Sequence, residues 1–430
     1  MVEKGTSGIP FIYNLFPSLL GPVDHWTPHV ERAVEMGFNW LFINPIHLTG
    51  ASGSLYAIRD YFRFSPVFFP YDAFEAQKAR FASFVGKCRE TGAEVMVDLV
   101  INHTAYDNPL TREHRDWYKL NADGSIKNPG AADDKAPGGH VVWGDLSEID
   151  NEHSADRNHL WEYWWKVVDM FLSCGVRGFR CDAAYQIPND LWRMLIGRAR
   201  ERHPECAFFA ETLGCPMEQT IDLACAGHDF VFNSGKWWDY RADWFVEQAR
   251  AGAGRIKSIC FPESHDTERL AAEWDRDLDR IKQHYLFSAL ISSGTLLLIG
   301  FEYGFMRKPH VVHTNAHDYE GANYDLTDYI RSVNALKRAH RVFAEDNRVE
   351  RMDVGDDAVL AIRKTTLDDK EAGLLVFNRT GRPVEVDLAD LARRLGVPAY
   401  RATEAANVKL PERAQRLRLN RYGAAAFRIY

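Results

Sequence analysis

The stretch at residues 94–103 reads EVMVDLVINH, an apolar, β-rich run that ends in polar residues. A short apolar run of this kind is typical of a strand buried in a parallel sheet. Similar runs recur through the first 300 residues, separated by longer helical patterns. The predicted strands span residues 11–16, 40–45, 94–101, 178–183, 207–211, 230–233, 258–262 and 295–300.

Amphipathic patterns between these strands predict helices that cover the sheet. Eight strands with intervening helices within about 340 residues favour a (β/α)8 TIM barrel over an open doubly wound sheet. No GxGxxG motif follows any predicted strand, which disfavours a dinucleotide-binding fold. The predicted helices span residues 26–36, 74–90, 160–174, 191–202, 216–226, 281–292 and 328–340.

Two segments depart from this alternation. Residues 103–155 form a long stretch rich in Asn, Asp, Gly and Pro, so we expect an inserted subdomain after strand three. After residue 349 the pattern changes to short alternating runs, which predict a C-terminal antiparallel β-sandwich domain at 349–430. The catalytic barrel would then comprise residues 1–102 and 156–348.

Composition excludes several classes of protein. A net charge of −8 disfavours sequence-independent binding to nucleic acid. The most apolar uncharged stretch, residues 286–301, is too short and too polar to span a membrane. The seven Cys are scattered and never spaced CxxC, which excludes a zinc ribbon and fits a reduced, cytoplasmic protein. The oligomeric state is left open.

Charged side chains stand at the ends of four predicted strands. In a parallel barrel the carboxyl ends of all strands meet at one mouth, so these side chains should lie together. Taken singly, each has a structural explanation, such as a helix cap for an Asp or an ion pair for Arg180 and Asp182. Together they predict an active site formed by Asp98, His103, Arg180, Asp182, Glu211, His265 and Asp266.

These segments resemble, in order along the chain, the four motifs of the α-amylase family of retaining glycoside hydrolases (family 13). The resemblance implies that Asp182 is the nucleophile, Glu211 the general acid/base and Asp266 the stabiliser of the transition state. It also implies that Tyr56, in GSLYAIRDY at 53–61, stacks on the sugar. The segments that carry it are DLVINH at 98–103, GFRCDA at 178–183, Glu211 and SHD at 264–266. The other implied substrate-binding residues are Asp98, His103, Arg180 and His265.

Retaining cleavage requires such a set of groups. One carboxylate attacks the anomeric carbon, and one protonated carboxyl group releases the leaving oxygen. An adjacent Arg keeps the attacking carboxylate ionised, whereas burial beside other acids raises the pKa of the proton donor. A third acid offsets the positive charge that develops on the sugar.

The chain departs from the family pattern at several positions. Ser264 stands where the family has Asn, and Tyr185 stands where it often has Lys. The family's calcium site would draw on Asn102 and Asp145, but Gln186 replaces its His. Because Ca²⁺ needs six to eight oxygen ligands, we expect no metal and no other cofactor.

The sequence therefore predicts an enzyme that cleaves α-glucosidic bonds of maltooligosaccharides or related α-glucosides through a covalent glycosyl-enzyme intermediate. An α-glucan glycosyltransferase using the same intermediate is the alternative, because residues 29–47 and 117–130 are similar to bacterial maltosyltransferases acting on maltose 1-phosphate. Their basic phosphate-binding stretch is missing, since residues 48–54 read LTGASGS. A non-catalytic carbohydrate-binding protein is a remote alternative, which the three acids disfavour.

Overall fold

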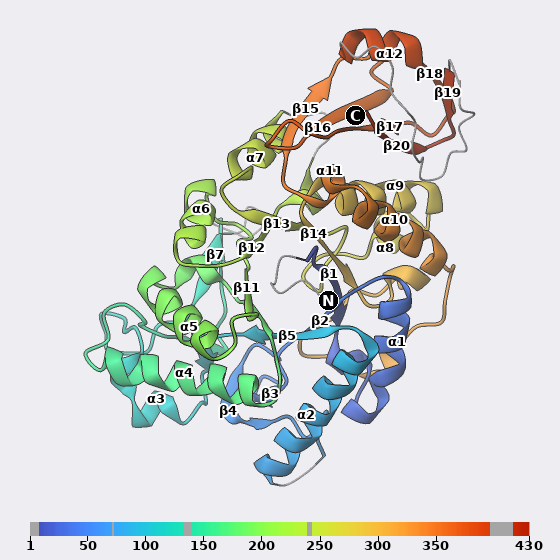
Figure 1. Ribbon diagram of the computed structural model, residues 1–430. Helices are drawn as coiled ribbons and strands as arrows, with labels where there is room; N and C mark the ends of the chain where they lie inside the picture. The colour runs from blue at the N-terminus through green and yellow to red at the C-terminus, as the bar shows by residue number, and fades with distance from the viewer. Residues whose placement is uncertain (1–7, 71–72, 133–138, 239–242, 396–415, 430) are drawn as a thin grey trace.

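The computed structural model describes residues 8–70, 73–132, 139–238, 243–395 and 416–429. Eight parallel strands close into a barrel in the order β1-β14-β13-β12-β11-β10-β5-β2 (Figure 1). This arrangement confirms the predicted (β/α)8 fold, and each observed strand falls on a predicted run to within two residues at either end. The strands are β1 (Phe11–Leu15), β2 (Trp40–Ile43), β5 (Glu94–Leu99), β10 (Gly178–Cys181), β11 (Ala207–Ala210), β12 (Phe230–Phe232), β13 (Lys257–Cys260) and β14 (Gly294–Leu298).

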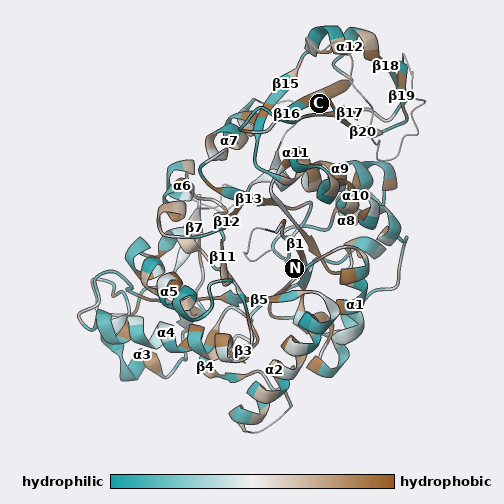
Figure 2. Ribbon diagram, viewed as in Figure 1, coloured by the Kyte–Doolittle hydropathy of each residue, from teal (hydrophilic) through white to brown (hydrophobic). Residues whose placement is uncertain are grey.

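Helices surround the barrel (Figure 2), and their buried apolar residues share one core cluster with the strands. All seven predicted helices are present, whereas α7 was not predicted, nor were the single-turn helices α3 (Leu110–Glu113), α8 (Leu270–Glu273) and α11 (Arg341–Ala344). Helix α7 is short and buries only Phe245 and Val246 fully, so no helical period was readable. The helices are α1 (Thr27–Glu35), α2 (Phe74–Thr91), α4 (Arg157–Ser173), α5 (Asn189–Arg202), α6 (Met217–Cys225), α7 (Trp244–Gly252), α9 (Leu278–Ile291) and α10 (Thr327–Ala339).

The barrel has two layers of apolar packing. Large side chains such as Phe42, Phe209 and Ile259 fill the interior between the strands. A larger cluster lies between the strands and the helices, and it includes fully buried Trp164 and Trp192. Both layers hold the strand ends in fixed positions, which is what a catalytic site at the barrel mouth requires.

The segment after strand β5 leaves the barrel as predicted. Strand β6 (His103–Ala105) pairs with β9 (Leu146–Glu148), and β7 (Gly130–Ala132) pairs with β8 (His140–Val142). A hairpin after β2, formed by β3 (His47–Thr49) and β4 (Ile58–Phe64), was not predicted. Its connecting residues include Tyr56, so this hairpin positions one of the predicted site residues.

The C-terminal residues form two antiparallel sheets, as predicted. Strands β15 (Arg348–Met352), β16 (Val359–Thr365), β17 (Ala372–Asn378) and β20 (Ala424–Arg428) form one sheet, and β18 (Val384–Asp387) and β19 (Arg416–Leu419) form the other. Apolar residues from both sheets and from α12 (Leu388–Leu395) share one core. Strands β15 and β19 and helix α12 were not predicted, because charged residues interrupt their patterns.

This C-terminal region packs on the barrel through helix α9. Lys364 on β16 donates from Nζ to the carbonyl oxygens of Leu290 (2.8 Å) and Ile291 (3.0 Å) at the end of that helix. Gln283 donates to the carbonyl oxygen of Asn378. Among the described residues, no helix combines the length and apolarity needed to cross a membrane.

Candidate active site

Arg180 joins two of the predicted acids at the barrel mouth. Strands β5 and β10 are neighbours, and their register sets Arg180 beside Asp98. Arg180 Nη1 donates to both Asp98 oxygens, at 2.8 and 2.9 Å, and to Asp182 Oδ1 at 2.8 Å. All three side chains are buried. Although burial opposes its charge, the carboxylates of Asp98 and Asp182 raise the pKa of Arg180 well above its ordinary value, so the guanidinium stays cationic.

Glu211 follows strand β11 and is held by backbone groups. The Ala183 N–H donates to Oε2 at 2.9 Å, and the Leu213 N–H donates to Oε1 at 2.7 Å. Burial raises the pKa of Glu211 to about 7, and the charges of Asp182 and Asp266 raise it while Arg180 lowers it. A carboxyl group with this pKa holds a proton in a substantial fraction of molecules at neutral pH.

Ala183, the residue after Asp182, has an unusual backbone conformation. Its φ of +42° lies in the left-handed region, which costs a non-glycine residue about 1 kcal/mol or more. The turn directs the Ala183 N–H at Glu211 while Asp182 keeps its bond to Arg180. The strained residue therefore couples the positions of the two acids.

Tyr56 connects Asp98 with the segment after β13. Its hydroxyl lies 2.7 Å from Asp98 Oδ2 and 2.7 Å from His265 Nε2. The Tyr56 and His265 rings are stacked, with centroids 5.8 Å apart and planes at 5°. His103 Nε2 lies 3.2 Å from the carbonyl oxygen of Tyr56. Because one phenolic proton cannot serve both partners, Tyr56 donates to Asp98 and accepts from the Nε2–H of His265.

Asp266 differs from the other two acids in exposure. Its side chain is 49% exposed, whereas His265 beside it is buried, and His265 Nε2 lies 3.1 Å from Asp266 Oδ2. Burial lowers the pKa of both His103 and His265, which favours neutral imidazoles at neutral pH. Asp266 thus presents its carboxylate to the open barrel mouth, and its contact with the buried His265 holds it in place.

The structure brings together all eight predicted site residues, each linked by a contact or by its electrostatic effect on another. Two residues that the sequence analysis did not single out support them. Asn44, at the end of β2, donates to the Tyr56 hydroxyl at 3.0 Å, and Asn14, on β1, donates to Asn44 Oδ1 at 2.8 Å. Both are polar residues at or near the ends of apolar strands, the same signal that singled out Asp98.

Two of the residues considered for calcium, Asn102 and Gln186, contact each other. Asn102 Nδ2 donates to Gln186 Oε1 at 3.2 Å, whereas Asn102 Oδ1 is buried and has no hydrogen-bond partner among the described residues. Among the described residues, no group of three His, Cys, Asp or Glu side chains is placed to hold a metal ion. Tyr185, half-buried, lies where its hydroxyl accepts from Gln186 at 3.4 Å.

The site lies at the mouth of a closed (β/α)8 barrel and contains an Asp paired with Arg, a second acid of raised pKa and a third acid that is exposed. This arrangement suits retaining glycoside chemistry. The family described as "Glycogen debranching enzyme, glucanotransferase domain" matches residues 11–121. These features agree with the family resemblance carried by the sequence motifs.

The chain is also similar to individual proteins that act on α-glucans or related sugars, by their names. The chain is 28% identical over 394 residues to the alpha-1,4-glucan:maltose-1-phosphate maltosyltransferase of Burkholderia pseudomallei, covering 88% of this chain and 34% of that protein. It is 21% identical to the cyclomaltodextrinase of Geobacillus thermopakistaniensis, covering 85% and 63%. The chain therefore spans about a third of the first relative and less than two thirds of the second.

Among solved structures, the fold is similar to an α-amylase from Lactobacillus plantarum, with a TM-score of 0.76, 20% identity, and coverage of 98% of this chain and 99% of that one. This likeness shows the fold. The family match and the two relatives confirm the predicted resemblance to the α-amylase family, and with it the prediction of an enzyme.

Proposed function

We propose that this chain cleaves α-glucosidic bonds of maltooligosaccharides with retention of configuration. The observation that supports it most is the contrast between two acids. Asp182 is paired with the permanently charged Arg180, whereas burial raises the pKa of Glu211 to about 7. A retaining glycosidase needs this pair, with one ionised nucleophile and one proton donor.

In the first step, Asp182 attacks the anomeric carbon and the bond from that carbon to the leaving oxygen breaks. Oδ1 of Asp182 accepts from Arg180, and within the described residues Oδ2 accepts no hydrogen bond, so Oδ2 is the attacking atom. Glu211 transfers its proton to the leaving oxygen. The Asp266 carboxylate offsets the positive charge on the oxocarbenium-like transition state.

In the second step, the Glu211 carboxylate takes a proton from a water molecule, and the water oxygen attacks the anomeric carbon. The ester bond to Asp182 breaks, and Glu211 is again protonated for the next cycle. The two backbone N–H groups on Glu211 hold its carboxyl group in place through both steps. Tyr56, half-buried beside His265, offers its ring to the sugar.

Transfer to a sugar acceptor is the second candidate. It uses the same intermediate and replaces water with a sugar hydroxyl. The specific observation in its favour is that the family matching residues 11–121 is a glucanotransferase domain, and that a maltosyltransferase is among the relatives. Under this alternative the acceptor would be the end of an α-glucan.

We also propose that the enzyme needs no metal and works in the cytoplasm. Gln186 in place of a His, bonded to Asn102, supports the first proposal. The second is supported by the cysteines, because all seven are free and five of them are buried. Unpaired thiols are the usual state in a reducing compartment.

Product analysis tests the proposed hydrolysis with retention against the alternative of glycosyl transfer. Purified chain is incubated with maltotriose and maltoheptaose, with and without maltose 1-phosphate, while proton NMR follows the anomeric signals. Hydrolysis with retention releases the α-anomer first and yields only shorter sugars, whereas transfer yields longer ones. First release of the β-anomer would contradict retention, and no turnover of any α-glucoside would contradict the proposed function.

A further inference from the structure

A line of hydrogen bonds joins strand β1 to the acids of the candidate active site. It begins at Asn14 on β1 and passes through Asn44, which follows β2, to the Tyr56 hydroxyl. From there it continues through Asp98 to Arg180, the cation that pairs with the proposed nucleophile. Both amide side chains are fully buried. A buried amide is costly unless its hydrogen bonds are made, so its partners determine which way each proton points.

This line has a fixed direction because it starts at a backbone carbonyl group. Asn14 Nδ2 lies 3.1 Å from the carbonyl oxygen of Phe42, the residue that pairs with Asn14 across β1 and β2. A carbonyl oxygen only accepts hydrogen bonds, so the nitrogen of the Asn14 amide must face it. The same nitrogen donates to Asn44 Oδ1 at 2.8 Å. The oxygen of the Asn44 amide is therefore turned toward Asn14, and its nitrogen toward Tyr56.

The Tyr56 hydroxyl consequently has donors on two sides. Asn44 Nδ2 donates to it at 3.0 Å, and His265 Nε2 lies 2.7 Å away. Because His265 Nε2 also lies 3.1 Å from Asp266 Oδ2, and a carboxylate only accepts, this nitrogen carries the proton. A hydroxyl accepts two hydrogen bonds and donates one. Its single proton is therefore left for Asp98 Oδ2, 2.7 Å away.

The direction of this proton affects the charge of Asp98. Burial, above all, raises the pKa of Asp98, and the charge of Asp182 raises it further. Arg180 and the hydrogen bond from Tyr56 lower this pKa. If Asp98 took up a proton, it would lose the charge that pairs with Arg180. The titratable and charged side chains around Asp98 are Arg180, Cys181 and Asp182 on and after β10, and Tyr56 between β3 and β4, with His265 behind its hydroxyl.

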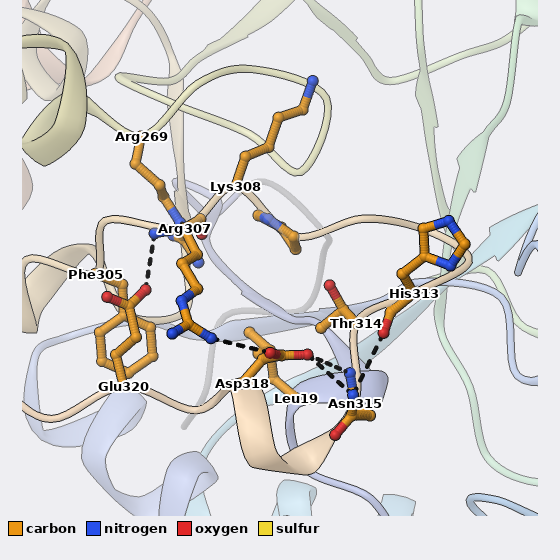
Figure 3. Close-up of a pocket in the computed structure, with 11 residues that line it drawn as sticks. Leu19, Arg269, Phe305, Arg307, Lys308, His313, Thr314, Asn315, Asp318 and Glu320 are labelled. Atoms are coloured by element: carbon orange, nitrogen blue, oxygen red, sulfur yellow. Dashed lines mark hydrogen bonds and ion pairs between the residues drawn. The ribbon is translucent and has the colours of Figure 1, made fainter.

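The loop between β3 and β4 has a support of its own. The Leu55 N–H donates to the carbonyl oxygen of Val311 at 3.0 Å, in the segment after β14. That segment is held together by Asp318, which accepts from the Arg307 side chain at 3.1 Å (Figure 3). A substitution at Asn44 therefore removes a hydrogen bond of the tyrosine that this loop carries, and it leaves the support of the loop in place.

We propose that Asn44 is a positioning residue, which directs the phenolic proton of Tyr56 onto Asp98. Asp98 thereby stays an ionised partner of Arg180, and Arg180 in turn orients the proposed nucleophile. Asn14 acts one step earlier, because it fixes which end of the Asn44 amide faces the phenol. This inference rests on the proposed function, since the rate it explains is that of the same retaining reaction.

The test compares two substitutions of nearly equal size at Asn44. N44L has no hydrogen-bonding group, whereas N44D presents an acceptor where the amide presents a donor. In N44D the phenolic proton can turn to the new carboxylate, which leaves Asp98 without its donor. We expect kcat/KM on maltotriose to fall about tenfold in N44L and at least about tenfold further in N44D, mostly in kcat. N158L and N158D, at exposed Asn158 on α4, are the matched controls and should keep wild-type rates.

The added charge of N44D has to be separated from the loss of the donor, since a nearby carboxylate disfavours ionisation of Asp98 in any case. Both substitutions are therefore also made in Y56F, which lacks the hydroxyl. There we expect N44D and N44L to differ by less than about threefold, because no phenolic proton remains to be turned. The acidic limb of kcat/KM should move to higher pH by about one pH unit or more in N44D, and much less when N44D is added to Y56F.

Equal losses in N44L and N44D would show that Asn44 only fills space, and would overturn the proposal. An excess loss in N44D that persists unchanged in Y56F would assign the effect to charge alone, with the same consequence. If the wild-type chain acts on no α-glucoside, the proposed function fails. The carboxyl carbon-13 signal of Asp98, identified by its loss in D98N, still reports the proton without turnover. It should titrate at higher pH in N44D than in N44L, and this difference should be lost in Y56F; no difference in the Tyr56 background would refute the inference.

Discussion

The raised pKa of Glu211 gives the sharpest test of the proposed mechanism. Burial and the neighbouring Asp182 and Asp266 raise this pKa from 4.5 to about 7. In a retaining enzyme the protonated form is the active one in the first step. We therefore expect kcat/KM on maltooligosaccharides to fall tenfold per pH unit above about pH 7, and E211Q to lose this alkaline limb.

The expected loss of activity in E211Q follows from the role of Glu211 as the general acid. General acid catalysis contributes about 10²- to 10⁴-fold, which corresponds to about 3–5 kcal/mol of transition-state stabilisation. E211Q should lose that factor on maltooligosaccharides and much less on an α-glucoside with an activated aryl leaving group, which needs little protonation. E218Q, an exposed Glu at the start of α6, is the control and should behave as wild type. An E211Q variant that keeps more than a tenth of the wild-type rate on maltotriose would refute the assignment.

The raised pKa of Glu211 also predicts how the stability of the fold changes with pH. A carboxyl group whose folded-state pKa is raised contributes stability below the unfolded pKa, and this contribution is lost as pH rises through the folded pKa. The rise in the pKa of Glu211 from 4.5 to about 7 means that the folded state destabilises the ionised carboxylate by about 3 kcal/mol. Gln carries no charge but loses one accepted N–H bond, worth about 1 kcal/mol. Thermal unfolding should find E211Q more stable than wild type at pH 8, by about 2 kcal/mol, and no more stable at pH 4; an unchanged difference across this range would contradict the raised pKa.

Three further predictions concern neighbouring groups. D182N should retain the fold by circular dichroism yet keep less than about a hundredth of the turnover, since it removes the nucleophile. D222N, at exposed Asp222, is the control and should keep the wild-type turnover. A D182N enzyme with a tenth of the wild-type rate would reassign the nucleophile. Y56F should lower kcat/KM by about tenfold or more, because the hydroxyl between Asp98 and His265 is lost, and an unchanged kcat/KM would show that this bond is dispensable. Activity should survive EDTA, because Gln186 replaces the family's His and its Oε1 already accepts from Asn102; inactivation that Ca²⁺ alone reverses would contradict this.

The fold was largely predictable because the barrel strands are buried on both sides. Such strands are nearly continuous apolar runs, as in VMVDL within β5, and they stand out from the amphipathic helices. The hairpin of β3 and β4 was not predictable in the same way. Charged residues interrupt β4, which reads IRDYFRF, and β3 is only three residues long. Pairing between two such weak strands becomes visible only in three dimensions.

The candidate site was predictable as a set of residues but not as a network. Motifs at four strand ends indicated which side chains to consider, and the barrel rule placed them at one mouth. The hydrogen bond from His265 to the Tyr56 hydroxyl joins residues 209 positions apart, and no local pattern encodes it. The left-handed backbone of Ala183 was equally hidden, because Ala carries no sequence signal for positive φ.

Arg180 shows how the fold and the site depend on each other. The spacing of two residues places Arg180 and Asp182 on one side of β10, and this much follows from sequence. Its bonds to Asp98 depend instead on the register in which Arg180 pairs with Asp98 across β10 and β5. A slip of one residue would turn Asp98 away and leave the buried guanidinium of Arg180 without that carboxylate, at a cost of about 3–5 kcal/mol. The ion pair that orients the proposed nucleophile therefore also fixes the register of the strands that carry it.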